Sequence, residues 1–365
     1  MRIVIATAQV PFVRGGAELH AEGLRDALQL SGHQAEIAAI PFKWYPPERI
    51  LDNILACRNL DLTESCGTPI DLLIGLKFPA YFIEHPRKVI WVLHQYRDAY
   101  DLWGHEYGAL HRYASGRMIR DAIEQADRML IPRAKKVFAN SLKVAERLKS
   151  YCGIDSEPLY HPPPNASQFH CGDYQPYFFF PSRLNRVKRQ ELVLQALART
   201  RHPVEVRFCG AGDDLDYAGS LPPLARELKL GTRVQWLGDI TEKDKADQYA
   251  NALAVLFPPW DEDYGYVTLE AMLSAKAVIT CSDSGGPLEF VRSSETGSGE
   301  TGLVADPTPE SLASAMDALW EDRAAEGKSA EGKSKAQRMG EAGRKLCETL
   351  GVSWKHAVEK LLSCV

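Results

Sequence analysis

Short apolar runs alternate along the first half of the chain with polar-rich segments whose apolar residues recur every three or four positions. A short apolar run is typical of a strand buried on both faces, and the longer spacing is typical of a helix with one buried side. The strand pattern occurs at 2–7, 35–40, 71–76, 88–94 and 135–141, and the first helical pattern stops at Gly32. Such alternation predicts a parallel sheet covered by helices on both faces.

The pattern breaks around residues 155–175, where proline and polar residues follow one another without periodicity, as in a linker between domains. The alternation then restarts. Strands are predicted at 177–182, 204–210, 233–238 and 254–259, with helices at 190–200, 222–231 and 241–252. The sequence therefore predicts two doubly wound α/β domains, at 1–170 and 171–345, followed by a C-terminal segment, 346–365, that carries the amphipathic stretch SWKHAVEKLLSCV.

Composition narrows the classes of protein. The chain has 365 residues and a formal charge of −5, so it has no basic field for nucleic acid. No apolar run is long enough to span a bilayer, and the start lacks the features of a signal peptide. The eight cysteines are scattered without a C-x-x-C pair, as expected for reduced thiols in a cytoplasmic protein. A mobile loop is predicted at 293–302, and the unit AEGKS, repeated at 325–334, has no assigned role.

The stretch DEDYGYVTLE (261–270) places acidic residues on both sides of a strand-to-helix junction. In a doubly wound domain ligands bind beyond the carboxyl ends of the strands, and the first amides of a helix favour phosphate. Gly265 permits close approach of the backbone, while Glu262 and Glu270 can accept hydrogen bonds from hydroxyls. A ligand with hydroxyls on both sides of a diphosphate is a nucleotide-sugar. The alternative is two exposed acids on an ordinary helix.

Two further strand ends carry candidate phosphate-binding groups. Arg183 and Lys188 follow the first predicted strand of the second domain, although basic residues at such positions are often ordinary surface. Gly15 and Gly16 follow the first strand of the chain, and Gly210 lies in FCGAGDD. None of these glycines completes G-x-G-x-x-G, which disfavours a nicotinamide dehydrogenase.

The order GGAE, SRL-N-RVK, GAGDD, WLGD, E-x7-E, GGPLE and TGLV resembles glycosyltransferase family 4. The resemblance covers nearly the whole chain and is strongest at 177–305. It implies the GT-B architecture, with two Rossmann-like domains facing a central cleft. The N-terminal domain would bind the acceptor and the C-terminal domain the nucleotide-sugar donor, and the last helix would cross back to the first domain.

The resemblance also implies roles for individual residues. Arg183 and Lys188 would hold the donor diphosphate, Glu262 would meet the sugar and Glu270 the ribose, while His94 would lie near the sugar. His94, Glu262, Arg183 and Lys188 form the implied catalytic set. The other implied donor-binding residues are Gly15, Gly16, Gly210, Gly238, Asp239, Asp263, Tyr264, Gly265, Tyr266, Val267 and Thr268. The family usually has Glu-Gly-Phe-Gly where this chain has Glu262-Asp263-Tyr264-Gly265, which leaves the identity of the sugar open.

The implied activity is that of a retaining hexosyltransferase-type enzyme of polysaccharide biosynthesis, with no metal and no cofactor. The donor is expected to be a UDP-sugar, with GDP-mannose second, and the acceptor a hydroxyl of a glycan, a lipid-linked or a small molecule. The alternatives are a UDP-sugar 2-epimerase-like enzyme and a non-catalytic nucleotide-sugar binding protein. The aromatic and Arg-rich segment 94–136 is interpreted as an acceptor groove, as a peripheral patch on the inner face of the membrane, or as ordinary helix surface.

Overall fold

The computed structural model describes residues 1–293, 299–323 and 332–364, and the chain divides into two compact units. The first unit comprises Met1–Pro164 and Val352–Val365, and the second comprises Asn165–Gly351. The predicted mobile loop at 293–302 and the repeated unit at 325–334 lie in large part outside the described residues.

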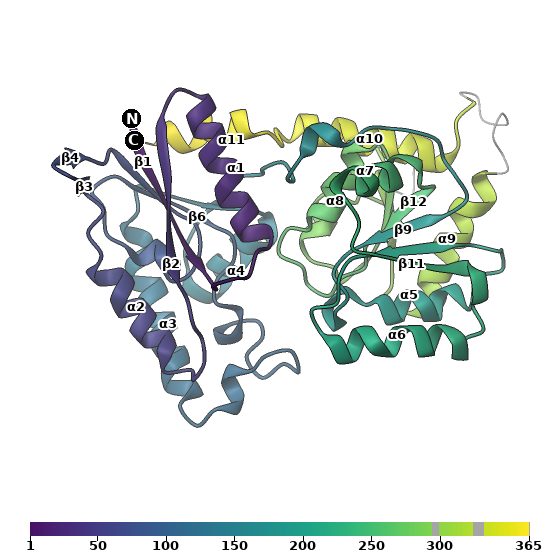
Figure 1. Ribbon diagram of the computed structural model, residues 1–365, viewed down its shortest axis with the longest axis horizontal. Coiled ribbons are helices and arrows are strands. Elements are labelled where there is room, and N and C mark those ends of the chain that lie inside the picture. The colour runs from purple at the N-terminus through teal and green to yellow at the C-terminus, as the bar shows by residue number, and fades with distance from the viewer. Residues whose placement is uncertain (294–298, 324–331, 365) are drawn as a thin grey trace. The chain divides into compact units, whose positions relative to one another are not determined.

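Six parallel strands form the sheet of the first unit in the order β2-β1-β5-β6-β7-β8. In sequence order they are β1 (Arg2–Gln9), β2 (Gln34–Pro41), β5 (Leu72–Gly75), β6 (Lys88–Val92), β7 (Lys136–Ala139) and β8 (Glu157–Pro158). Figure 1 labels β1, β2 and β6 of this sheet. The strands β3 (Glu64–Ser65) and β4 (Thr68–Pro69) form a separate antiparallel pair. The helices are α1 (Gly16–Leu30), α2 (Arg49–Asn59), α3 (Gly116–Leu130), α4 (Leu142–Cys152) and α11 (Trp354–Leu362).

The second unit contains another six-stranded parallel sheet, in the order β11-β10-β9-β12-β13-β14. In sequence order its strands are β9 (Phe178–Pro181), β10 (Val206–Cys209), β11 (Val234–Gly238), β12 (Ala254–Leu256), β13 (Ala277–Cys281) and β14 (Gly302–Ala305). Its helices are α5 (Gln190–Leu197), α6 (Leu215–Glu227), α7 (Glu242–Asn251), α8 (Tyr266–Leu273), α9 (Pro309–Arg323) and α10 (Lys335–Thr349). The prediction of two Rossmann-like α/β domains is therefore confirmed.

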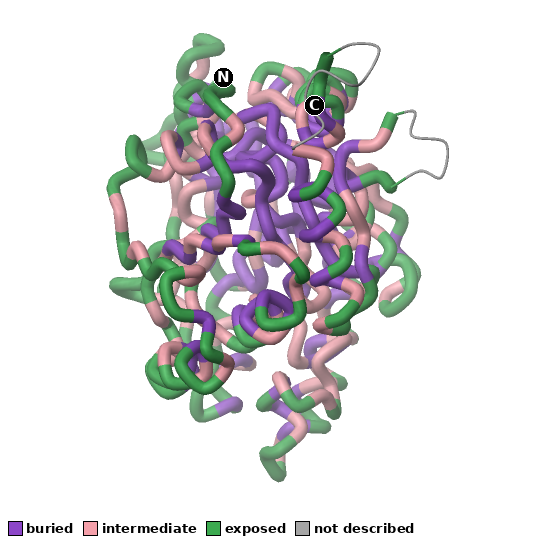
Figure 2. Tube along the Cα trace, turned by 90° about the vertical axis from the view of Figure 1, so that its right-hand side faces the viewer, coloured by how far each residue is buried: buried purple, intermediate pink, exposed green. Residues whose placement is uncertain are grey.

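The central strands are buried along their whole length, as the continuous apolar runs of the sequence predict. Every residue of β5, β6, β9, β12 and β13 is buried. Figure 2 shows these buried segments as an inner layer, with the exposed positions gathered in loops and on the outer sides of helices. Side chains at these strand ends are therefore attached to rigid elements.

The C-terminal helix α11 packs against α1 within the first unit. A Cβ atom at Gly23 of α1 would lie 2.4 Å from the indole ring of Trp354, so glycine makes room for that ring. On its other side Trp354 stacks on His161, with ring centroids 5.5 Å apart. The last helix of the chain is thus part of the core of the first unit.

Two predicted boundaries are wrong. The helix expected at 222–231 begins at Leu215, because the Asp214 carboxylate caps it by accepting the Tyr217 amide at 2.9 Å. The helix continues through Pro222 and Pro223, which were interpreted as its start, because its apolar side is buried against the core. The irregular stretch at 155–175 also begins inside the first unit, where β8 pairs with β7.

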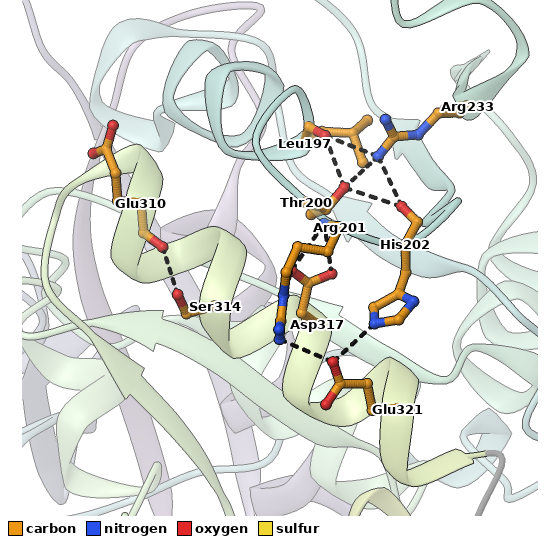
Figure 3. A network of polar contacts seen from close by, with 9 residues as sticks. All are labelled: Leu197, Thr200, Arg201, His202, Arg233, Glu310, Ser314, Asp317 and Glu321. Atoms are coloured by element: carbon orange, nitrogen blue, oxygen red, sulfur yellow. Dashed lines mark hydrogen bonds and ion pairs between the residues drawn. The ribbon is translucent and has the colours of Figure 1, made fainter.

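A polar network fixes the C-terminal end of α5 to α9 (Figure 3). The buried Asp317 carboxylate of α9 accepts the Arg201 amide at 3.0 Å. One turn further along, Glu321 accepts hydrogen bonds from the side chains of Arg201 and His202, both at 2.8 Å. The network secures one end of α5, and the candidate site lies at its other end.

Candidate functional site

The strand order of the second unit reverses between β9 and β12. From β9 the chain builds outward through β10 to β11, and it then returns to the other side of β9 with β12. In open α/β sheets ligands bind at such a switch point, beyond the carboxyl ends of the two strands. The loop after β9 carries Arg183 and Lys188, and the loop after β12 carries Glu262 and Gly265. The topology thus brings together the two segments that the sequence marked separately.

Lys188 and Glu262 form an ion pair across this switch point. The Lys188 side chain is 11% exposed and the Glu262 side chain 25%, so the pair is partly shielded from water. The Lys188 ammonium group also lies 5.4 Å from the centre of the Phe257 ring, within reach of a cation–π contact. The resemblance assigned Lys188 to the diphosphate and Glu262 to the sugar, and the structure shows that these two side chains also bind each other.

Backbone hydrogen bonds attach the Glu262 loop to the loop that follows β13. The Glu262 amide donates to the Ser284 carbonyl at 3.0 Å, and the Glu262 carbonyl accepts the Gly286 amide at 2.8 Å. Gly285 has φ +71, and a Cβ atom there would lie 2.5 Å from the Glu262 carbonyl oxygen. The glycines of GGPLE are therefore required for the backbone that positions Glu262.

Helix α8 begins at the same place. Its cap residue, Gly265, has φ +85, and a Cβ atom there would lie 3.0 Å from Phe257. The first amides of the helix belong to Tyr266 and Val267, and the Thr268 amide donates to the Gly265 carbonyl at 3.0 Å. The amides nearest the helix start are those that suit an anion.

The aromatic side chain of the motif is buried. Tyr264 is 5% exposed, and its ring packs against Phe290 and Tyr266, with both centroid separations 5.8 Å. Its neighbour Asp263 is half-buried, and the Asp263 carbonyl lies where a Cβ atom on Gly286 would approach to 2.6 Å. Tyr264 therefore supports the loop by packing. The backbone of Asp263 lies close to Gly286, next to the backbone that positions Glu262.

Glu270 lies within α8 and is held by two side chains of α7. The Tyr249 hydroxyl donates to one carboxylate oxygen at 2.5 Å, and the Lys245 ammonium group lies 3.5 Å from the other. Burial and the Glu270 charge raise the pKa of Tyr249 well above its usual value. Burial disfavours the charge of Lys245, but Glu270 and Glu242 more than offset this and raise its pKa. Glu270 is 7% exposed, so its carboxylate has a fixed direction.

The loop after β9 also carries Arg183, which is far more exposed than Lys188. Its guanidinium group pairs with Asp213 at 2.6 Å, and the Asn185 amide donates to the same carboxylate oxygen at 3.2 Å. Gly210 brings the next loop close, since a Cβ atom there would lie 2.3 Å from the Ser182 carbonyl. The Gly210 amide donates to the Gly238 carbonyl at 2.9 Å. These glycines align the ends of β9, β10 and β11, and Asp239 directly follows β11.

The glycines of the first unit lie at the start of α1, which follows β1. Gly15 caps the helix, and its amide donates to the Glu18 carboxylate at 2.9 Å. The φ of Gly15 is −147°, which other residues also adopt, and Gly16 is the first helical residue. The Lys77 ammonium group, directly after β5, lies 3.6 Å from Glu18. Strands β1 and β5 flank the switch point of this sheet, so these residues lie at the edge where ligands bind in open α/β sheets.

His94 follows β6 in the same unit. Its Nδ1 lies 2.8 Å from the Gln95 carbonyl oxygen, so a neutral ring carries its proton on Nδ1. In that tautomer Nε2 is a hydrogen-bond acceptor, as a sugar hydroxyl requires.

Several residues of the site carry no recognisable sequence signal. Lys245 and Tyr249 lie on an ordinary amphipathic helix. Arg189 and Asp283, which form an ion pair, also carry no recognisable signal. Asp213 is the exception, because it belongs to the GAGDD segment. Within the described ranges no group of three His, Cys, Asp or Glu residues is arranged to hold a metal ion. None of the helices within these ranges is both long and apolar enough to cross a bilayer.

Comparison with known proteins agrees with this geometry. Residues 168–346 match the family model of the glycosyl transferases group 1. The D-inositol 3-phosphate glycosyltransferase of Nocardia farcinica is 27% identical over 260 residues, which cover 66% of this chain and 54% of that protein. The alpha-1,3/1,6-mannosyltransferase ALG2 of Homo sapiens is 27% identical over 229 residues, covering 55% and 53%. The chain thus spans about half the length of these relatives.

Solved structures share the fold along the whole chain. Sucrose-phosphate synthase from Thermosynechococcus elongatus superposes with a TM-score of 0.72 at 17% identity, covering 99% of this chain and 97% of that one. Anabaena Alr3699/HepE, crystallised with UDP-glucose, superposes with a TM-score of 0.69 at 16% identity, covering 100% and 98%. Both units therefore have the GT-B type of α/β fold.

Proposed function

We propose that this chain, which belongs to the group 1 glycosyltransferases through residues 168–346, transfers a sugar from a nucleotide-sugar to an acceptor hydroxyl. The observation that carries the proposal is the set of groups at one switch point. A Lys188–Glu262 ion pair, the start of α8 and a fixed Glu270 carboxylate converge there. Cations and helix amides suit a diphosphate, and the two carboxylates suit hydroxyls on either side of it.

A UDP-sugar is the favoured donor. Anabaena Alr3699/HepE, which has this fold, has been crystallised with UDP and with UDP-glucose. GDP-mannose is the second candidate, since one group of relatives is named as mannosyltransferases. The epimerase alternative has less support, because the relatives are named as transferases.

We further propose that transfer retains the anomeric configuration. The bond from the anomeric carbon to the diphosphate breaks, and the acceptor oxygen bonds to that carbon on the same face. The acceptor proton passes to the departing phosphate oxygen. Lys188, Arg183 and the α8 amides stabilise the charge that develops on the phosphate, each contributing on the order of 3 kcal/mol. Glu262 and Glu270 accept hydrogen bonds from the sugar and the ribose. The side chains of Lys188 and Arg183 offset the phosphate charge that a metal ion would otherwise offset, so we expect no metal or other cofactor to be needed.

The acceptor is proposed to bind the first unit. His94, which follows β6, would hydrogen-bond the sugar or position the acceptor. The segment 94–136 supplies aromatic rings and arginines that suit a glycan, a lipid-linked acceptor or an anionic small molecule. We place the reaction in polysaccharide biosynthesis in the cytoplasm, with any contact to the membrane peripheral.

A donor panel tests the proposal. The protein is incubated with UDP-, GDP- and ADP-sugars, and both the shift in melting temperature and the release of nucleoside diphosphate are measured. We expect a UDP-sugar to give the largest shift and turnover to be unaffected by EDTA. Glu262→Gln and Lys188→Ala should each lower turnover at least about 100-fold. Lys243→Ala is the matched control, because this exposed lysine pairs with Asp247 on the surface of α7.

Three outcomes would contradict the proposal. A protein that neither binds nor cleaves any donor is not a glycosyltransferase. Full turnover in both site variants would refute the roles of Lys188 and Glu262. NMR of the product reads the anomeric configuration, and an inverted product would refute the retaining mechanism. Release of a free 2-epimer without transfer would favour the epimerase alternative.

A further inference from the structure

Arg189 has an unusual backbone conformation for its residue type. It lies between Lys188 and the first residue of α5, and its φ and ψ are +60° and +42°. A side chain in this left-handed region costs roughly 1–2 kcal/mol, and glycine normally occupies such positions. The chain therefore accepts a local backbone cost to keep an arginine here, which indicates that the side chain has a role.

The side chain of Arg189 makes a two-fold contact with Asp283. Its two terminal nitrogens lie 2.7 and 2.6 Å from the two carboxylate oxygens, which is the forked geometry of a strong charge-assisted pair. The Arg189 side chain is 19% exposed and the Asp283 side chain 35%. Asp283 lies in the loop after β13, and β12 separates β13 from β9 in the sheet. The pair therefore links the start of α5, which follows β9, to the loop after β13.

Asp283 also holds the loop that carries Glu262. Its backbone carbonyl accepts the Asp261 amide at 3.0 Å. A neighbouring bond joins the Trp260 amide to the Val187 carbonyl at 2.7 Å, which ties this loop directly to the loop after β9. Asp283 therefore binds Arg189 through its side chain and Asp261 through its backbone.

The two residues that Asp283 holds are direct chain neighbours of the ion pair at the candidate site. Arg189 follows Lys188, and Asp261 precedes Glu262. A shift of Asp283 would move both members of the Lys188–Glu262 pair, and loss of the Arg189 contact would release the Lys188 side of it.

We propose that Arg189 and Asp283 are positioning residues that fix the distance between Lys188 and Glu262. The inference rests on the proposed function, in which these two residues contact the donor. A mere stabilising role explains the pair less well. A partly exposed ion pair contributes about 1 kcal/mol or less, which does not exceed the backbone cost of Arg189, roughly 1–2 kcal/mol. Glycine would avoid that cost, so we infer that arginine is present because its side chain fixes the position of the backbone next to Lys188.

Substitutions at both ends of the pair test this role. Arg189→Gly removes the forked contact and suits the left-handed backbone, while Asp283→Asn keeps the backbone carbonyl and removes the charge. We expect either change to lower kcat about 10- to 100-fold, because small displacements of catalytic groups have effects of this size. The kcat of the double variant should be no lower than that of the less active single variant, since both changes break the same contact. Melting temperatures should stay within a few degrees of wild type.

Hydrogen exchange supplies a readout that needs no substrate. The amides of Trp260, Asp261 and Glu262 should exchange faster in both single variants, because Arg189 no longer holds Asp283, whose backbone binds their loop. Arg199→Ala is the matched control, since Arg199 forms a 2.6 Å pair with Glu310 near the other end of α5. This control should change neither the exchange nor kcat.

The outcomes separate the two proposals. Unchanged exchange and unchanged kcat in Arg189→Gly and Asp283→Asn would overturn the positioning role. Additive losses in the double variant would also overturn it, because the residues would then act independently. If the wild-type protein processes no donor, the proposed function fails, and the exchange rates still decide whether the pair fixes the loop.

Discussion

Lowering the pH should destabilise the first unit through two buried histidines, His20 and His161. The Nδ1 of His161 lies 3.2 Å from the Pro162 carbonyl oxygen, so it carries a proton and donates. The Nε2 of His161 then accepts from the Nδ1 of His20, 2.9 Å away. Among the described residues, the remaining Nε2 of His20 has no partner. Both rings are buried, so a charge on either is disfavoured, and charging both would place two N–H donors face to face.

The size of the effect follows from linkage. Burial lowers the pKa of His161 to about 3. Burial and repulsion from His161 lower the pKa of His20 well below its usual value. The unfolded chain takes up both protons near pH 6.5, whereas the folded unit does not, so stability is full above pH 6.5 and falls as the pH drops toward 3. Between pH 7.5 and 5.5 each histidine costs about 1.4 kcal/mol and the pair about 3 kcal/mol, or roughly 5–10 °C in melting temperature.

The assay compares wild type with the double variant His20→Phe/His161→Phe by calorimetry at both pH values. The variant removes the nitrogens of both rings, so no buried ring nitrogen is left without its hydrogen-bond partner. We expect the transition of the first unit to lose roughly 5–10 °C more in wild type than in the variant. His33→Gln, at a half-buried histidine outside the pair, is the control and should behave like wild type. Parallel pH dependence in wild type and the double variant would refute the neutral-pair interpretation.

Three further predictions concern single contacts. Tyr249→Phe removes the hydrogen bond to Glu270 and should raise the donor KM about tenfold, whereas Tyr177→Phe, whose hydroxyl donates to Gln248 on the same helix, should leave KM unchanged in steady-state kinetics. Gly285→Ala should lower the free energy of unfolding in urea titrations by about 2–4 kcal/mol, and Gly231→Ala by about 1 kcal/mol. Both glycines have positive φ, but a Cβ atom would clash with its neighbours only at Gly285. Gly23→Ala should lower the melting temperature by displacing Trp354, whereas Gly219→Ala, a helical position with open space, should raise it slightly; equal shifts would refute the packing argument.

The fold was largely predictable, because buried parallel strands are continuous apolar runs whatever surrounds them. The failures occurred where tertiary packing outweighed a local signal. Pro222 and Pro223 predict a helix start, yet α6 passes through them because the Asp214 cap and the buried Tyr217 and Leu221 hold the preceding turn. The apparent linker begins late for a similar reason, since β8 joins the sheet and His161 is buried despite its proline-rich surroundings.

The site was predictable in its positions but not in its contacts. Strand ends and glycines marked Lys188, Glu262 and Gly265, and the strand order brings them together. The partners of Glu270 were not predictable, because Lys245 and Tyr249 lie on a polar helix and are selected only by the packing of α7 against α8. Arg189 gave no signal either, since its left-handed backbone is invisible in a run of basic residues.

The pairing of charges at the switch point explains how such a site can discriminate between ligands. Three cations of the loop after β9 each face a carboxylate: Arg183 with Asp213, Lys188 with Glu262 and Arg189 with Asp283. A bare phosphate that approached Lys188 would also meet Glu262, so repulsion would offset much of the attraction. A ligand that carries hydroxyls beside its phosphates can satisfy the cation and the carboxylate together. We therefore expect inorganic pyrophosphate to bind more weakly than an intact nucleotide-sugar. Glu262→Gln should strengthen pyrophosphate binding and so narrow the difference in affinity between the two ligands.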